Sequence, residues 1–288
     1  MTINGTAPVV PPHSYGWRKD PYNPQAVYHC PKAVAVPPTI NLLNFCPPVR
    51  DQDGVGACTG FGIGGMAYTV ALAYALVHNL PIPEIFSPNW LYNGARFIEG
   101  TLSQDAGANP QDVFNWALQN GLLVEHFWPF QDKLDKTAPG TTRMAEATKY
   151  ANFTVFRVAD GISGITSALA DGHCVALGCP WPGSWVSGSK NILPAPDYVD
   201  GGHETFLYGY DYNEQSLFLQ NSWGTGWSSG GRCKIPFSAL DWFKTNGGYD
   251  AHYITMDGPI VPPPPKPPKK CWFGIKQKPA QAAVGACG

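Results

Sequence analysis

The sequence has few charged residues. They make up 14% of its 288 residues, compared with about a quarter in an average globular protein. The formal net charge is −2, so no strong field of one sign favours nucleic acid or an anionic membrane as a partner. The chain also lacks an apolar run of the roughly 18 residues that a membrane span needs. Residues 69–80 come closest, and His78 interrupts them.

The start of the chain lacks the features of a secretory signal peptide. The first residues, Met1-Thr-Ile-Asn-Gly-Thr-Ala-Pro, contain neither a basic start nor an apolar stretch. We therefore expect a protein that is cytoplasmic or exported by a non-classical route.

The eight cysteines include no Cys-x-x-Cys pair, and Cys174 and Cys179 are spaced unlike two zinc ligands. A chain of this size does not depend on a disulfide framework to fold. We predict mostly reduced, buried thiols, no metal site and no organic cofactor.

Hydrophobic residues (44%) and aromatic residues (13%) are plentiful enough for a large core, while 32 glycines and 29 prolines predict long loops. Helical periodicity dominates the first half and short strands dominate the second, which predicts an α+β fold with two lobes. We expect helices at 58–80, 87–99, 109–120 and 161–170, and strands at 39–48, 151–158, 174–179, 205–212, 217–220, 231–236 and 250–256.

One glycine-rich stretch organises the rest of the chain: Val49-Arg-Asp-Gln-Asp-Gly-Val-Gly-Ala-Cys58-Thr-Gly-Phe. An alanine-rich apolar run follows, so the loop delivers Cys58 to the first turn of a long helix. The positive end of the helix dipole favours the thiolate, which is the reactive form of cysteine. Gln52 lies six residues earlier, where its amide can help the backbone N–H of Cys58 stabilise an oxyanion.

Two later segments supply the other groups that a cysteine nucleophile needs. Gly-Gly-His203 stands before an apolar run, and Asn221-Ser-Trp223-Gly-Thr-Gly-Trp ends another. His203 is the candidate base that takes the thiol proton and then protonates the leaving amine. Asn221 would orient the imidazole, and Trp223 would cover that hydrogen bond. His203 follows Cys58 by 145 residues and Asn221 follows it by 163, against about 130–150 in papain-type enzymes.

Together these motifs resemble the papain-like cysteine peptidases of bacteria and phages. The Gln-Asp-Gly-x-Gly-x-Cys, Gly-Gly-His and Asn-Ser-Trp-Gly-Thr-Gly-Trp boxes stand in the family's order, and the resemblance covers residues 42–258. Further matches lie at 87–96 and 107–130. Two positions depart from the family: Val55 stands where a disulfide cysteine is usual, and Thr59 where an aromatic residue is usual. Neither departure removes a catalytic group.

The resemblance implies a papain-like two-lobed fold, with a helical N-terminal lobe, an antiparallel β-sheet C-terminal lobe and the active site in the cleft between them. It implies a cysteine endopeptidase that acts on peptide or protein substrates through a thioester acyl-enzyme. Gly56 would let the substrate chain approach closely, and Asp200 and Trp223 are further candidate substrate contacts. Two alternatives stay open: an inactive papain-like binding protein, and a Cys-His amidase or acyltransferase.

The chain divides into three parts: an arm (1–38), a peptidase domain (39–258) and a Pro-rich linker with a tail (259–288). The family is generally made with an inhibitory propeptide that crosses the cleft in reverse. The arm is proline-rich and too short for the usual helical propeptide, but it carries aromatic residues that need a docking site: Tyr15, Trp17, Tyr22 and Tyr28. We hypothesise that it covers the cleft and keeps the enzyme latent; the alternative is an arm packed on the back of the domain.

Overall fold

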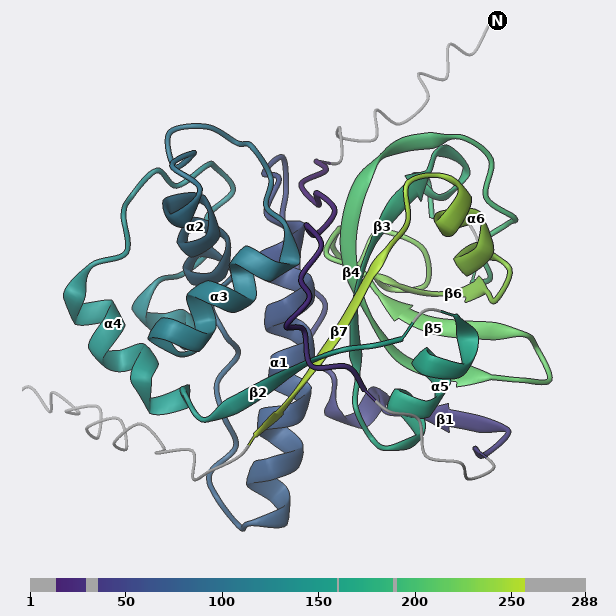
Figure 1. The fold of residues 1–288 in the computed structure, drawn as a ribbon, viewed down its shortest axis with the longest axis horizontal. Helices are drawn as coiled ribbons and strands as arrows, with labels where there is room; N and C mark the ends of the chain where they lie inside the picture. The colour runs from purple at the N-terminus through teal and green to yellow at the C-terminus, as the bar shows by residue number, and fades with distance from the viewer. Residues whose placement is uncertain (1–13, 30–35, 160, 189–190, 257–288) are drawn as a thin grey trace, which may run out of the picture.

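A computed structural model describes residues 14–29, 36–159, 161–188 and 191–256, and two lobes share these residues (Figure 1). The expectations for the Pro-rich linker and tail lie outside the described residues. One lobe is built from the helices of the first half of the chain. Its helices are α1 (Cys58–Val77), α2 (Pro88–Ile98), α3 (Pro110–Asn120) and α4 (Thr141–Ala147).

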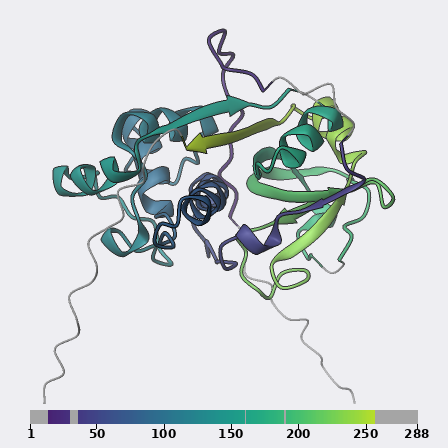
Figure 2. The same ribbon diagram turned by 90° about the horizontal axis from the view of Figure 1, so that it is seen from below.

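The second lobe is formed around one antiparallel sheet of seven strands, in the order β2-β7-β3-β4-β5-β6 with β1 paired to β4. The strands are β1 (Thr39–Asn41), β2 (Phe153–Arg157), β3 (Val175–Pro182), β4 (Val199–Asp211), β5 (Ser216–Gln220), β6 (Arg232–Pro236) and β7 (Asp250–Met256). Helices α5 (Ile162–Ala170) and α6 (Ala239–Thr245) belong to this lobe, and α1 lies on the side of the helical lobe that faces the sheet (Figure 2). The predicted α+β class with two lobes is therefore confirmed.

Local signals explain where α2 begins and where α3 begins and ends. The side chain of Ser87 accepts a hydrogen bond from the Trp90 backbone N–H and caps α2. Asn109 does the same for α3 through the Asp112 N–H, and Pro110 follows in the first turn. Gly121 then ends α3 with φ of 83°, a conformation that suits glycine. These signals match the helix ends predicted from the sequence.

The early glycines of α1 let the helix contact other backbone closely. A Cβ added at Gly60 would lie 2.5 Å from the carbonyl oxygen of Pro88, and one at Gly62 would lie 3.0 Å from that of Thr205. Glycine lowers helix propensity by about 1 kcal/mol per residue, and this close packing of α1 on α2 and β4 compensates for that cost.

Replacing Gly60 by alanine is expected to destabilise the protein by about 1–3 kcal/mol, because the added methyl group meets backbone that cannot move aside. Urea unfolding would show this as a lower transition midpoint. Gly140→Ala is the matched control, since a Cβ at Gly140 meets nothing within 4 Å. Equal midpoints for the two variants would contradict the close-packing explanation.

Two predicted strand boundaries were wrong, and two short helices were not predicted. The strand expected at 39–48 shrinks to β1, and a 3-10 turn (Leu43–Phe45) replaces its second half. Strand β4 begins at Val199, six residues before the predicted start, so His203 lies inside the strand and not in front of it. Helices α4 and α6 were not predicted; each is a short helix of seven residues.

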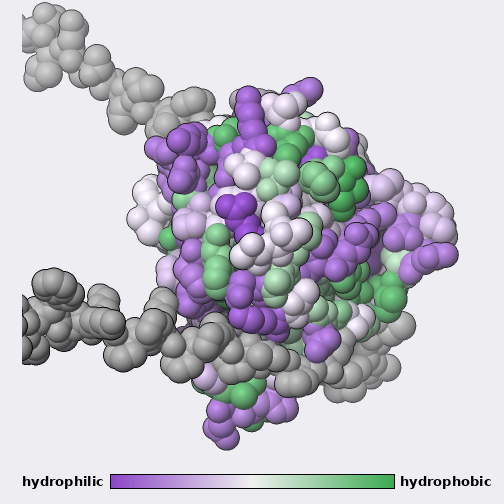
Figure 3. All heavy atoms as spheres, turned by 90° about the vertical axis from the view of Figure 1, so that its left-hand side faces the viewer, coloured by the Kyte–Doolittle hydropathy of each residue, from purple (hydrophilic) through white to green (hydrophobic). Residues whose placement is uncertain are grey.

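The surface of the helical lobe is mixed, with hydrophilic side chains between small apolar patches (Figure 3). Helix α1 has the length and composition of a membrane span, but 61% of its most apolar 18-residue window is buried inside the protein. Packing in the core therefore accounts for its apolar character.

Candidate active site

Cys58 is the first residue of α1 and is fully buried between the lobes. Backbone groups of Thr59, Glu204 and Gly16 lie within hydrogen-bonding reach of its thiol. These contacts favour the thiolate, but burial outweighs them and raises the pKa of Cys58 to about 12. The thiolate expected from the helix dipole is therefore not the stable form in this structure, because the site is closed to water.

The structure joins His203 and Asn221 by a hydrogen bond. The imidazole Nε2 lies 2.7 Å from the side-chain Oδ1 of Asn221, and both residues are buried. His203 lies in β4 and Asn221 directly follows β5, so the antiparallel pairing of these two strands brings them together. The Trp223 ring lies over the imidazole, with ring centroids 4.5 Å apart, and Trp181 packs edge-on against it.

Gln52 is completely buried and is held by the segment that carries Asn221. Its backbone N–H donates to the carbonyl of Ser222 (2.8 Å), and its Oε1 accepts a hydrogen bond from the Ser222 hydroxyl (2.6 Å). The side-chain Nε2 is thereby turned to donate to two carbonyl oxygens, those of Val55 (2.8 Å) and Ser14 (3.0 Å). An oxyanion-hole donor must lie about 2.7–3.1 Å from the position that the oxyanion will occupy, and Gln52 Nε2 remains the candidate for that donor.

The arm supplies one of those carbonyls, because its backbone runs through the cleft. The N–H groups of Gly16 and Trp17 donate to the carbonyl of Gly202, at 3.1 and 3.0 Å. On the opposite wall, Ala108 donates to Gly16 (2.7 Å) and accepts from Arg18 (3.0 Å). The arm is seen as the dark purple segment between the lobes in Figure 1.

The three candidate substrate contacts all touch this arm. The Tyr15 hydroxyl donates to Asp200, and the Tyr15 ring packs edge-on against Trp223, with centroids 5.9 Å apart. A Cβ at Gly56 would lie only 2.8 Å from the Tyr15 carbonyl oxygen. Residues 14–20 of the arm therefore lie along the cleft, beside all three of these residues.

Further along, Asp20 anchors the arm to the sheet lobe and the helical lobe together. Its carboxylate accepts a hydrogen bond from the Gln111 N–H (2.7 Å), and its own N–H donates to Asp250 (2.8 Å). Burial, and then the nearby charge of Asp250, raise the pKa of Asp20 to about 7. Neither Asp20 nor Asp250 was predicted from the sequence, because no sequence pattern pairs positions 230 residues apart.

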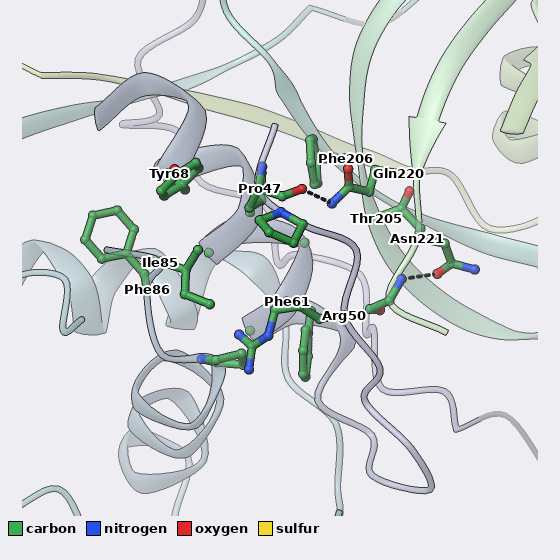
Figure 4. Close-up of a pocket in the computed structure, with 17 residues that line it drawn as sticks. Pro47, Arg50, Phe61, Tyr68, Ile85, Phe86, Thr205, Phe206, Gln220 and Asn221 are labelled. Carbon is green, nitrogen blue, oxygen red and sulfur yellow. Dashed lines mark hydrogen bonds between the residues drawn. The ribbon is translucent and has the colours of Figure 1, made fainter. Parts of the chain in front are cut away.

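A small cavity is lined by α1, Arg50, Phe206 and the segment from Gln220 to Ser222 (Figure 4). Its volume is about 30 Å³. That space is large enough for a water molecule but not for a peptide side chain.

The described part of the chain contains five cysteines, all free thiols: Cys46, Cys58, Cys174, Cys179 and Cys233. All but Cys46 are buried, in agreement with the expectation of reduced, buried thiols.

Comparison with known proteins agrees with this architecture. No family model matches the chain. It is 26% identical over 203 residues to an uncharacterised peptidase C1-like protein of Acanthamoeba polyphaga mimivirus, covering 65% of this chain and 63% of the relative. The chain thus spans slightly less than two thirds of that relative's length.

Solved structures show the same fold. Xylellain, a cysteine protease from Xylella fastidiosa, matches with a TM-score of 0.75 and 24% identity, covering 85% of this chain and 97% of xylellain. Digestive procathepsin L 3 of Tenebrio molitor larval midgut matches with a TM-score of 0.65 and 15% identity, covering 85% and 76%. The family resemblance drawn from the sequence is therefore confirmed: this chain has the fold of the papain-like cysteine peptidases.

Proposed function

We propose that this protein is a cysteine endopeptidase that hydrolyses peptide bonds through Cys58 and that the docked arm keeps it latent. The carrying observation is the hydrogen bond from Gln52 Nε2 to the carbonyl of Ser14, two residues before Gly16 at the thiol. A polypeptide backbone thus occupies the cleft with a carbonyl oxygen on the proposed oxyanion donor. The sequence similarity to a peptidase C1-like protein supports the same chemistry.

In the proposed reaction the arm leaves, water enters, and His203 takes the proton of the Cys58 thiol. The thiolate attacks the substrate carbonyl, and Gln52 with the Cys58 N–H stabilises the oxyanion. The imidazolium gives its proton to the leaving amine, which departs and leaves a thioester on Cys58. His203 then activates a water molecule that hydrolyses the thioester. The hydrogen bond to Asn221 keeps the imidazole oriented through both steps.

The course of the arm favours an endopeptidase over an exopeptidase. Ser14 and Tyr15 lie on one side of the catalytic groups, at Gln52 and Trp223, while Lys19 and Asp20 reach Asp250 on the other side. A cleft that holds chain on both sides of the thiol accepts the interior of a polypeptide. The procathepsin of Tenebrio molitor with this fold is a proform, which supports latency as the resting state here.

Labelling with an epoxide selective for papain-like thiolates tests the proposal. The full chain and a chain shortened by residues 1–38 would be treated, and intact mass with peptide mapping would locate the adduct. We expect one adduct per molecule, at Cys58, in the shortened chain and little in the full chain; Cys58→Ser controls for other thiols. Equal labelling of both chains would show that the arm does not close the site.

Absence of labelling in both chains, with a free Cys58 thiol, would favour an inactive papain-like binding protein. Labelling without cleavage of any peptide would favour a Cys-His amidase or acyltransferase, and analysis of products from amide and ester substrates would separate these two.

A further inference from the structure

A buried carboxyl group lies beside the catalytic groups without a partner. Glu204 directly follows His203 in β4 and is fully buried. In the described part of the chain, neither of its carboxyl oxygens has a hydrogen-bond partner. An unsatisfied buried polar group costs free energy and is uncommon in folded proteins. Its presence next to the candidate histidine calls for an explanation in terms of function.

Register across three strands explains what surrounds this carboxyl. Gly178 of β3 pairs with Glu204 of β4 on one side and with Asp250 of β7 on the other. Side chains of residues paired across strands point to the same face of a sheet. Two acidic side chains therefore flank a glycine, and the missing side chain of Gly178 leaves a slot between them.

The indole of Trp17 fills this slot. A Cβ added at Gly178 would lie 2.0 Å from Trp17 Nε1 and 2.3 Å from Glu204 Oε2, so the two polar atoms meet over the same glycine. The indole N–H is buried and makes no hydrogen bond within the described residues. Trp17 therefore fills the slot sterically but leaves the carboxyl oxygens of Glu204 without a hydrogen bond. A ligand that matched the slot would supply hydrogen-bond donors to them.

The two acidic groups differ in their charge balance. Asp250 has two cations nearby: Arg157 at 2.9 Å and Lys19 at 3.7 Å. Among the ion pairs of the described ranges, none includes Glu204. Under the arm, burial and then the charges of Asp250 and Asp20 raise the pKa of Glu204 well above its ordinary value, which favours its neutral form. A cation entering the slot would favour its ionised form.

We propose that the slot over Gly178 is a specificity pocket for a lysine or arginine side chain of the substrate, with Glu204 as the counter-charge. This inference rests on the proposed function, because it concerns the substrate of the same cleft. A long basic side chain has an apolar stem that can lie along the walls of the slot. It also has N–H groups that can donate hydrogen bonds to the two carboxyl oxygens of Glu204. Pairing a buried carboxylate with a guanidinium gives a strong, directional contact.

The first test needs no catalysis and uses the full chain. Trp17→Arg places a guanidinium on the arm itself, and the rate at which iodoacetamide labels Cys58 reports how often the arm lifts away. We expect slow labelling when Glu204 is present, and labelling about tenfold faster or more when Trp17→Arg is combined with Glu204→Gln, the effect of one lost charged hydrogen bond. Trp17→Leu is the control, expected to respond much less to Glu204→Gln.

The second test measures specificity. In the full chain, Tyr15→Ala with Trp17→Ala opens the cleft, and a fluorogenic peptide library fixes Arg, Lys, Leu or Trp at each position in turn. We expect a preference for Arg and Lys at one position, with the kcat/KM ratio of Arg to Leu falling about tenfold or more on Glu204→Gln. Glu99→Gln, which removes an arm contact of Arg18, is the matched control and should leave the ratio unchanged.

The outcomes separate the two proposals. Cleavage with a preference for apolar or aromatic residues that ignores Glu204→Gln would overturn the basic pocket and leave the peptidase intact. No cleavage and no epoxide adduct would overturn the peptidase. In that case the labelling experiment with Trp17→Arg still decides whether the slot accepts a cation: equal effects of Glu204→Gln on the Trp17→Arg and Trp17→Leu chains would exclude it.

Discussion

Alkylation of Cys58 by iodoacetamide at neutral pH should become about a thousandfold faster when Tyr15→Ala and Trp17→Ala open the cleft. Only the thiolate reacts at an appreciable rate. Under the arm, burial raises the pKa of Cys58 to about 12, whereas an exposed cysteine has a pKa of about 8.5, and a difference of three to four units changes the thiolate fraction at pH 7 by about that factor. Timed quenching and peptide mapping would measure the rate.

The pH dependence of the same reaction follows from the sign of two shifts. Burial under the docked arm raises the pKa of Cys58 to about 12. Burial also raises the pKa of Asp20, to about 7. A raised pKa means that the docked state binds protons more tightly than the open state. The contribution of Asp20 to docking is therefore full below its free pKa of about 3.9 and is lost as the pH rises through about 7.

Cys58 of the full chain should thus be labelled slowly at pH 5 and increasingly fast above pH 7. Its labelling rate should still be rising at pH values where the rate of the Tyr15→Ala, Trp17→Ala variant has reached its maximum. Asp20→Asn, which removes the titrating group, should flatten the rise between pH 5 and 8. Faster labelling of the full chain at acid pH would contradict this assignment and show that protonation, not ionisation, releases the arm.

Much of this architecture was predictable, because it depends on local signals. Asn109, Pro110 and Gly121 act within a few residues of the helix whose ends they mark, and ordered motifs made Cys58, His203 and Asn221 the candidate catalytic residues. The early start of β4 was not predictable, because Val199 to Gly202 have no alternating pattern and are held in the strand by pairing with β3. Short helices such as α4 present too few turns for a periodic pattern.

The position of Glu204 illustrates a different limit. A glutamate in a strand is ordinarily assigned to the solvent face, and its burial here depends on Gly178 opposite and on Trp17 above it. One signal was present: this charged residue immediately precedes the apolar run from Thr205 to Tyr212. A charged residue next to the Gly-Gly-His motif can be recognised in the sequence. That Trp17 covers Glu204 can be known only from the tertiary structure.

Gln52→Ala should lower kcat/KM of the opened enzyme by about a hundred- to a thousandfold, the usual cost of one lost oxyanion donor. Gln52 also holds the arm, since its Nε2 donates to the Ser14 carbonyl. In the full chain, the same substitution should therefore speed the labelling of Cys58 while it slows turnover in the open variant. A merely structural role of Gln52 does not predict faster labelling together with slower turnover.

Gln220→Ala, which removes another buried amide bonded to a carbonyl oxygen, is the matched control. Near-normal turnover of Gln52→Ala would exclude this side chain from the oxyanion hole and assign that role to the Cys58 N–H with other donors.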